Sequence, residues 1–366
     1  MNGRSLSIVF LGLSLSSSWG NGHATTYRAL LRALAERGHD VVFLERDVPW
    51  YAANADLLYP SFCRLDLYGD LDDLARRHRR LLSEADVVIV GSFVPQGCAV
   101  ARLVLGWATG LVGFYDIDTP VTLAKLDARD EEYLSPALVP AFDFYLSFTG
   151  GPTLERLRRD YGARLPWPFY CMVDPSIYRP TGEPKRWDLG YLGTYSADRQ
   201  PALERLLIET ARRLPDRRFV VAGAQYPDSI DWPGNVELIE HVPPSAHASF
   251  YSRLRFALNL TRRNMLATGW SPSVRLFEAA ACGAVILSDR WEGLDSFFPE
   301  NEAIVAVEDA DDVETALARL DPSTISSIAA RAREIVLANH TGHDRARDLE
   351  MAFEAAGLSR PQKIRI

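Results

Sequence analysis

The chain has 366 residues, of which 47% are hydrophobic and 24% are charged. These values are typical of globular proteins, and the length exceeds what one hydrophobic core supports, so we expect two domains. The 40 basic and 48 acidic side chains give a formal charge of −8. This disfavours sequence-independent nucleic-acid binding, which depends on dense lysine and arginine. The four cysteines are far apart without a CxxC motif, which argues against a zinc site or disulfide framework and fits a reducing compartment.

The first twenty residues admit two interpretations. Arg4, the apolar stretch 6–15 and the serines 16–18 resemble a secretory signal peptide. The alternative is a buried first strand over residues 6–11, followed by a loop. We favour the strand because no A-x-A cleavage site follows and a helix continues directly downstream. No stretch approaches the ~20 apolar residues of a membrane span, so we expect a soluble cytoplasmic protein.

The N-terminal half alternates strands and helices. Short runs rich in isoleucine, valine and phenylalanine predict strands that are buried on both faces. Leucines at helical spacing predict the helices between them, and Gly38 fits the end of the first helix. The predicted strands are 6–11, 40–44, 87–90, 111–115 and 144–148, and the predicted helices are 24–37, 71–83 and one that begins at Pro152.

Five prolines within residues 166–184 favour extended, turn-prone chain, and this stretch predicts an interdomain linker. After it the alternation restarts. The predicted strands are 188–192, 218–222, 256–260 and 284–287, and the predicted helices are 203–214 and 274–282.

Two successive β/α halves predict an α/β protein with two doubly wound parallel sheets that face each other. Ligands of such sheets bind beyond the carboxyl ends of the strands, so we expect a central cleft to which each domain contributes its strand-end loops. The predicted boundaries are an N-terminal Rossmann-like domain over 1–168, a linker over 169–184, a C-terminal Rossmann-like domain over 185–340, and a C-terminal helix and tail over 341–366.

Residues 271–285, SPSVRLFEAAACGAV, resemble the donor-binding helix of GT-B glycosyltransferases, whose usual form is E-A-x-A-x-G-x-P-V. The S-x-R-x-F-E version is similar to that of the CgeB-type (spore maturation protein) branch. Residues 170–180 resemble the linker phrase of the same fold, and 192–199 resemble its G-R-L-x-x-x-K segment. His340-Thr341, with Arg345 beyond, is similar to the H-T near the end of CgeB-type chains.

This resemblance spans about residues 170–345, and the N-terminal half matches only at the level of fold. It implies a GT-B fold with an acceptor domain followed by a donor domain. The implied activity is transfer of a sugar from a nucleotide-diphosphate sugar to a hydroxyl-bearing acceptor, without an obligatory metal. We therefore expect a nucleotide sugar as donor substrate and no separate cofactor. The acidic composition adds the expectation of no nucleic-acid partner.

Two departures from the family pattern bear on mechanism. Many retaining GT-B enzymes carry a first glutamate eight positions before the helix glutamate, and that position is Trp270 here. A two-glutamate retaining mechanism therefore cannot be carried over, which favours inversion. The Arg of G-R-L is Thr194, and its Lys position holds Arg199. One diphosphate cation is thus lost or supplied by another arginine: Arg262, Arg263 or Arg275.

The donor chemistry follows from the start of the 274–282 helix. Ser273 precedes the helix. The first N–H groups of the helix, beginning with that of Val274, are free to bind an anion, and the helix dipole favours the anion there. Arg275 lies in this first turn, where a cation opposes the dipole unless an anion binds nearby; the alternative is a structural salt bridge. Glu278 is the ribose partner that the resemblance implies. The predicted donor-site residues are Gly193, Arg199, Arg262, Arg263, Ser273, Val274, Arg275 and Glu278.

On the acceptor side, residues 18–23 form a glycine-containing loop between the first strand and helix. The loop lacks the third glycine of a dinucleotide signature, since that position is Thr25. His23 has the pKa range of a general base. Some inverting GT-B enzymes use such a histidine with an aspartate from a later strand end, and Asp116 and Asp118 are the candidates here. The alternative is that His23 is a hydrogen-bonding loop residue.

Other interpretations stay open at this point. Asp116-Ile117-Asp118 matches the D-x-D metal motif of another glycosyltransferase fold, but that motif belongs to a different architecture and we predict no metal site. The glycine-containing loop and Glu45 after the second strand also fit an NAD-type oxidoreductase, which leaves residues 271–283 unexplained. A sugar-nucleotide epimerase or a non-catalytic sugar-nucleotide-binding protein of the same fold is also compatible with the pattern.

Overall fold

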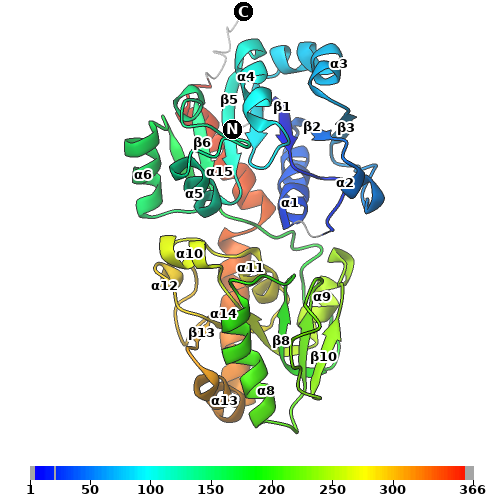
Figure 1. Ribbon diagram of the computed structural model, residues 1–366, viewed down its shortest axis with the longest axis vertical. Coiled ribbons are helices and arrows are strands. Elements are labelled where there is room, and N and C mark those ends of the chain that lie inside the picture. The colour runs from blue at the N-terminus through cyan, green and yellow to red at the C-terminus, as the bar shows by residue number, and fades with distance from the viewer. Residues whose placement is uncertain (1–4, 20–21, 359–366) are drawn as a thin grey trace, which may run out of the picture. The chain divides into compact units, whose positions relative to one another are not determined.

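The computed structural model describes residues 5–19 and 22–358. It divides the chain into two compact units. Unit 1 comprises the described residues of Met1–Tyr170 and Gly342–Ile366, and unit 2 comprises Cys171–Thr341 (Figure 1). Each unit contains one parallel β-sheet with helices, which confirms the predicted α/β class.

The sheet of unit 1 has seven strands in the order β3-β2-β1-β4-β5-β6-β7. All neighbouring strands are parallel, and β1 lies at the centre, where Ile8 pairs with both Val41 and Val87. The strands are β1 (Ser7–Gly12), β2 (Asp40–Arg46), β3 (Arg64–Tyr68), β4 (Val87–Gly91), β5 (Leu111–Asp116), β6 (Phe144–Ser147) and β7 (Pro166–Pro168). The helices are α1 (Gly22–Glu36), α2 (Pro49–Ala53), α3 (Leu71–Glu84), α4 (Gly97–Trp107), α5 (Thr119–Asp127), α6 (Pro152–Tyr161), α15 (Gly342–Ala355) and the 3₁₀ turn η1 (Val139–Ala141).

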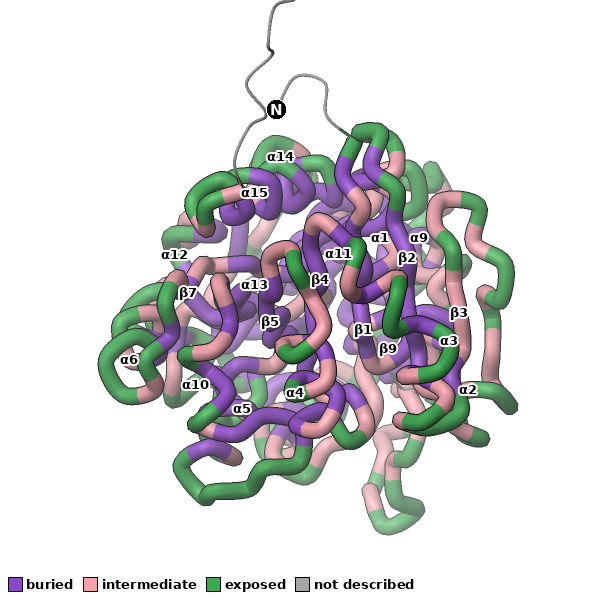
Figure 2. The backbone as a smooth tube through the Cα atoms, turned by 90° about the horizontal axis from the view of Figure 1, so that it is seen from above, coloured by how far each residue is buried: buried purple, intermediate pink, exposed green. Residues whose placement is uncertain are grey.

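The central strands of unit 1 are buried on both faces. Every residue of β4 is buried, and β1 and β2 are buried along nearly their whole length. Figure 2 shows these strands in purple, with α15 and α4 on opposite sides of β4 and β5. This two-sided cover explains why the strands read as continuous apolar runs instead of alternating ones.

The sheet of unit 2 has six parallel strands in the order β10-β9-β8-β11-β12-β13. The strands are β8 (Trp187–Leu192), β9 (Phe219–Ala222), β10 (Val236–Ile239), β11 (Leu254–Asn259), β12 (Val285–Ser288) and β13 (Val305–Ala306). The helices are α7 (Gln200–Leu203), the π-helical η2 (Glu204–Ile208), α8 (Glu209–Arg213), α9 (Pro244–Ser252), α10 (Arg263–Thr268), α11 (Val274–Ala281), α12 (Leu294–Phe297), α13 (Ala310–Arg319) and α14 (Pro322–Asn339).

Both sheets reverse their strand order beside their first strand. In unit 1 the reversal lies between β1 and β4, and in unit 2 it lies between β8 and β11. Loops that leave neighbouring strands in opposite directions open a crevice at the carboxyl edge, which is where doubly wound sheets bind ligands. The loops after β1, β4, β8 and β11 are therefore the places to look for a site.

The proline-rich stretch 169–184, predicted to be a linker, belongs to unit 2 from Cys171 onward. Met172, Val173 and Tyr178 are buried, and the Val173 N–H donates to the His340 carbonyl at 3.0 Å. Proline prevents a regular helix or central strand, but it does not prevent irregular chain from packing. Residues 341–366 were predicted to form a separate C-terminal helix and tail, but α15 is part of unit 1.

A buried carboxylate fixes α15 to the start of the chain. Glu350 accepts two bonds of 2.6 Å from the Arg37 guanidinium and one of 2.9 Å from Nε2 of His39. Nδ1 of His39 in turn accepts the Leu6 N–H at 3.2 Å. At Gly342 a Cβ atom would lie only 2.5 Å from the Ala29 carbonyl oxygen, so glycine permits this close packing on α1.

Glu350→Gln is expected to lower the unfolding free energy by about 1–3 kcal/mol at pH 7, because Arg37 and His39 lose a carboxylate partner. Burial acts to raise the pKa of Glu350, but bonds from Arg37 and His39 hold it below its ordinary value. The carboxylate's contribution is therefore lost as the pH falls through the lowered folded-state pKa, and the gap between parent and variant should close in acid.

Urea unfolding across pH measures this effect. Glu334→Gln is the matched control, since Glu334 forms an exposed pair with Arg331 on α14 and should change stability by less than about 0.5 kcal/mol. Equal stability of the parent and Glu350→Gln proteins at pH 7 would contradict the anchoring role of Glu350.

Candidate active site

Two arginines come together at the carboxyl edge of the sheet in unit 2. Arg275, in the first turn of α11, has its guanidinium carbon 5.5 Å from the centre of the Tyr191 ring. It also lies beside Gly193, where a Cβ atom would be 2.6 Å from the Tyr191 hydroxyl and 3.1 Å from an Arg275 nitrogen. Glycine at position 193 therefore leaves the space that both side chains occupy.

Arg199, in the loop after β8, is buried, and one of its terminal nitrogens donates to the Thr194 carbonyl at 2.7 Å. Its Nε has no hydrogen-bond partner in the described part of the chain. Burial, followed by the positive charge of Arg275, lowers the pKa of Arg199 to about 10. Within residues 5–19 and 22–358, no carboxylate forms an ion pair with either guanidinium.

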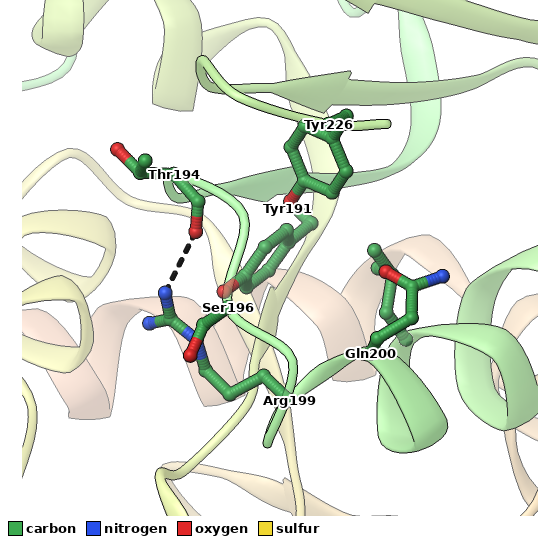
Figure 3. Close-up of a pocket in the computed structure, with 7 residues that line it drawn as sticks. Tyr191, Thr194, Ser196, Arg199, Gln200 and Tyr226 are labelled. Atoms are coloured by element: carbon green, nitrogen blue, oxygen red, sulfur yellow. Dashed lines mark hydrogen bonds between the residues drawn. The ribbon is translucent and has the colours of Figure 1, made fainter. Parts of the chain in front are cut away.

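The loop after β8 is held in place around a small pocket (Figure 3). The Tyr226 hydroxyl donates to the Gly193 carbonyl at 2.9 Å, and the Tyr195 N–H donates to the Ala224 carbonyl at 2.9 Å. Figure 3 shows Arg199 reaching back toward Thr194. The residues that line the pocket are Tyr191, Thr194, Ser196, Arg199, Gln200, Leu203 and Tyr226.

The N-terminus of α11 carries no side-chain cap. Ser273 occupies the cap position with extended backbone, but its hydroxyl donates to the Asn259 side-chain oxygen at 2.7 Å. The N–H groups of Val274 and Arg275 are therefore not satisfied by a capping side chain. Uncapped N–H groups and a nearby cation suit an anion.

Glu278 lies one turn further along α11 and is buried. Its Oε2 accepts a bond of 3.1 Å from the Tyr251 hydroxyl, and Nδ1 of His247 lies 3.8 Å away. The Tyr178 hydroxyl lies 3.2 Å from that histidine nitrogen and also bonds Glu278. Residues from the proline-rich stretch and from α9 thus orient this carboxylate.

Arg262 and Arg263 are exposed at the start of α10. The Arg263 N–H donates to Asp198 at 3.1 Å, while the charge of Arg262 contributes to the lowered pKa of Arg199. Arg262 therefore adds to the positive potential around Arg199.

The sequence did not single out Trp270 as a site residue, although it precedes α11 by only four positions. Its φ is +48°, a left-handed conformation that is strained for a bulky side chain. Its N–H donates to the Glu292 carbonyl at 2.6 Å, and its ring fills the space where Gly293 would carry a Cβ. The Gly269-Trp270 pair, which directly precedes Ser271, was the sequence feature that could have indicated this left-handed turn.

Three of the family-like segments meet within unit 2. The Phe277 ring of α11 stacks on the His340 ring, with centroids 4.3 Å apart and planes inclined by 16°. Val173 forms a β-bridge with Thr341. His340-Thr341 therefore packs against the donor-type helix and the proline-rich stretch, which is a structural role.

In unit 1 the loop after β1 folds around Glu45 at the end of β2. This buried carboxylate accepts bonds from the N–H groups of Leu15 and Ser16 at 2.7 and 2.9 Å. It also accepts the hydroxyls of Ser14 and Ser16 at 3.0 and 2.6 Å. Since four loop donors occupy Glu45, it is not placed to bind a ribose as an NAD-type oxidoreductase would require. Positions 20 and 21 of the predicted glycine-containing loop lie outside the described residues.

His23 lies in the first turn of α1 and is partly buried. Its ring packs edge-to-face on Phe93, with centroids 5.5 Å apart, and Phe93 packs on Tyr133 at 4.6 Å. Phe93 is the second residue after β4, and its φ is +62°. A strained residue beside the predicted base fits a functional loop at the β1/β4 reversal.

The two aspartates after β5 lie in different environments. Asp116 is fully buried, and its two oxygens accept the hydroxyls of Thr122 and Tyr145, each at 2.6 Å. It forms no bond to His23. Asp118 lies at the N-cap of α5 and is only partly buried. Among the described residues no group of three or more His, Cys, Asp or Glu side chains could hold a metal ion.

Comparison with known proteins is informative for the fold. Residues 199–351 match the family model described as "Glycosyl transferase-like". Sucrose-phosphate synthase from Thermosynechococcus elongatus is 14% identical, over 95% of this chain and 98% of that one, with a TM-score of 0.69. HepE from Anabaena, solved with UDP and glucose, is 13% identical over 96% and 100%, with a TM-score of 0.71. This chain has the GT-B fold.

Another similar structure is an alpha-glucosyltransferase in complex with UDP and a 13-mer DNA that contains an HMU base. It is 14% identical over 96% of this chain and 100% of that one, with a TM-score of 0.68. No curated protein gives a significant match to the chain. Within the described residues, none of the helices combines the length and the apolar character needed to span a membrane.

The buried Asp116 gives a pH-dependent prediction. Burial raises the pKa of Asp116 to about 6, against the lowering effect of the bonds from Thr122 and Tyr145. A raised folded-state pKa means that ionised Asp116 costs stability, and that cost grows as the pH rises from about 4 to above 6. Asp116→Asn removes the charge, so the parent's stability relative to the variant should fall by up to roughly 3 kcal/mol across this range.

Thermal or urea unfolding of both proteins between acid and neutral pH measures this difference. Tyr145→Phe is the matched variant: it removes one bond to the carboxylate, so the transition should move to higher pH. A stability difference between parent and Asp116→Asn that does not change with pH would show that the Asp116 pKa is ordinary.

Proposed function

We propose that this protein is a glycosyltransferase that moves a sugar from a nucleotide-diphosphate sugar to a hydroxyl-bearing acceptor, without an obligatory metal. The observation that carries the proposal is the pair Arg199 and Arg275. Two neighbouring cations, of which Arg199 is buried and Arg275 partly buried, repel each other, and a bound diphosphate relieves this repulsion. The uncapped N-terminus of α11 supplies further N–H donors to the same anion.

The remaining donor residues have matching roles. Glu278, oriented by Tyr251 and Tyr178, accepts bonds from ribose hydroxyls, and Arg262 adds positive charge near the diphosphate. As the bond to the sugar breaks, negative charge grows on the leaving phosphate, and fixed cations stabilise that charge. Several of the similar structures contain UDP or UDP-glucose, which supports UDP-glucose as the first donor to test. The S-x-R-x-F-E motif supports placement in the CgeB-type branch.

The acceptor hydroxyl must lose a proton during transfer. We assign the base to His23 and its orienting carboxylate to Asp118, because both oxygens of Asp116 are already occupied by Thr122 and Tyr145. Trp270 in place of a first glutamate favours an inverting displacement, in which the acceptor oxygen attacks as the nucleotide leaves and His23 takes the proton.

Arg275→Ala should weaken UDP binding by about 1.5–3 kcal/mol, the range for hydrogen bonds to charged groups. Titration calorimetry with UDP measures this. Arg186→Ala is the control, since Arg186 forms an exposed pair with Glu237 in the same unit and should bind UDP like the parent. Parent-like affinity of Arg275→Ala would make Arg275 a structural residue and remove the main support for the donor site.

His23→Ala should lower UDP release from UDP-glucose, with water or an added sugar as acceptor, by roughly 10²–10⁴-fold. UDP affinity should stay near that of the parent, since His23 acts on the acceptor. Asp118→Asn should reproduce part of the loss, because a histidine without its carboxylate more often adopts the wrong tautomer. Near-parent turnover of His23→Ala would exclude His23 as the base and favour retention.

A further inference from the structure

Exposed apolar side chains concentrate in one segment of unit 1, between β2 and β3. Of the seven large hydrophobic side chains exposed in the described chain, three lie within residues 50–59. Trp50 is 55% exposed, Leu58 48% and Tyr59 91%. The other four are scattered: Ile177, Leu238, Leu266 and Met351. Exposed apolar patches mark binding sites, and the concentration of such side chains in this segment makes it the candidate surface.

This segment is tied to the loop and helix that carry His23. The N–H groups of Asp56 and Leu57 both donate to the Ser16 carbonyl, at 2.9 and 3.0 Å. The Asp56 carboxylate accepts a bond of 2.6 Å from the Ser18 hydroxyl and pairs with Arg28 of α1. The exposed rings are thus fixed to the elements that hold the proposed base, at the carboxyl edge of the sheet.

The charge of the segment narrows the partner. Residues 47–63 contain Asp47 and Asp56 but no lysine or arginine. The arginines around the segment are engaged with other groups: Arg28 pairs with Asp56, Arg64 pairs with Asp66, and Arg32 lies over the Phe62 ring. Nucleic acids and anionic lipid surfaces are recognised through clusters of available cations, so this segment favours a neutral partner. A neutral saccharide does fit, because the C–H faces of its sugar rings carry partial positive charge and pack on the negative faces of aromatic rings.

We propose that residues 48–60 bind a neutral saccharide as the acceptor, with Trp50 and Tyr59 as its stacking surfaces. The proposal rests on the proposed function, since it names the acceptor class of the same reaction. Because the segment is bonded to the loop that precedes His23, the saccharide bound there supplies the hydroxyl whose proton His23 takes.

The test uses the full chain and three defined probes: maltopentaose, cellopentaose and chitopentaose. Saturation-transfer NMR and the fluorescence of the protein measure binding at millimolar concentrations. We expect at least one probe to bind the parent, and Trp50→Ala and Tyr59→Ala each to weaken it by about tenfold, as loss of an aromatic anchor does. Leu238→Ala is the control, since Leu238 is another large apolar side chain that is 50% exposed, on β10 of unit 2.

With UDP-glucose as donor, the two aromatic variants should raise the KM for the saccharide while kcat and UDP affinity stay near those of the parent. Absence of binding by all three probes, or unchanged binding by both variants, would overturn the proposal. Trp50-dependent sedimentation with phosphatidylglycerol vesicles would overturn it in favour of a membrane surface. UDP binding by the parent protein separates the two proposals. A parent that binds a saccharide but does not bind UDP would refute the donor site and leave the saccharide proposal standing.

Discussion

Parallel strand pairing requires a crossover connection after each strand, and this requirement determines where the candidate site residues lie. Each parallel strand must be followed by a segment that runs back over a face of the sheet, so every strand delivers its carboxyl end to the same edge. β1 and β4 in unit 1, and β8 and β11 in unit 2, send their following segments in opposite directions. The segments that follow these strands carry His23 and Phe93 in unit 1, and Arg199 and Arg262 in unit 2.

Buried charges serve two different purposes in the two units. Glu45 and Glu350 are buried with a full set of donors, and each holds together segments that are distant in the sequence. Arg199 is buried with one carbonyl partner and a second cation beside it. A buried charge with a full set of partners holds segments together, whereas a buried charge with few partners favours the binding of an ion of opposite sign.

The sequence predicted the strands that are buried on both faces, such as β1, β4 and β11, because continuous apolar runs identify them. It missed β3 and β10, whose residues are mostly half-exposed and mixed in polarity, and β7, whose Pro-Trp-Pro sequence is unlike a strand. It predicted an anion beside Arg275 from the start of the helix and from the family resemblance, and that role stays a prediction. It could not separate Asp116 from Asp118, because only the positions of Thr122 and Tyr145 show that Asp116 is already engaged.

The discontinuity of unit 1 has a consequence for synthesis on the ribosome. Unit 2 is one continuous stretch, so all of its contacts are available once Thr341 has emerged. Unit 1 needs α15, the last helix made, to cover α1 and to bring Glu350 to Arg37 and His39. While the rest of the chain is translated, the apolar face of α1 that α15 later covers therefore stays exposed within the first 170 residues. Such a state is prone to aggregation. A premature stop before α15 should thus harm the earliest part of the chain and spare the middle.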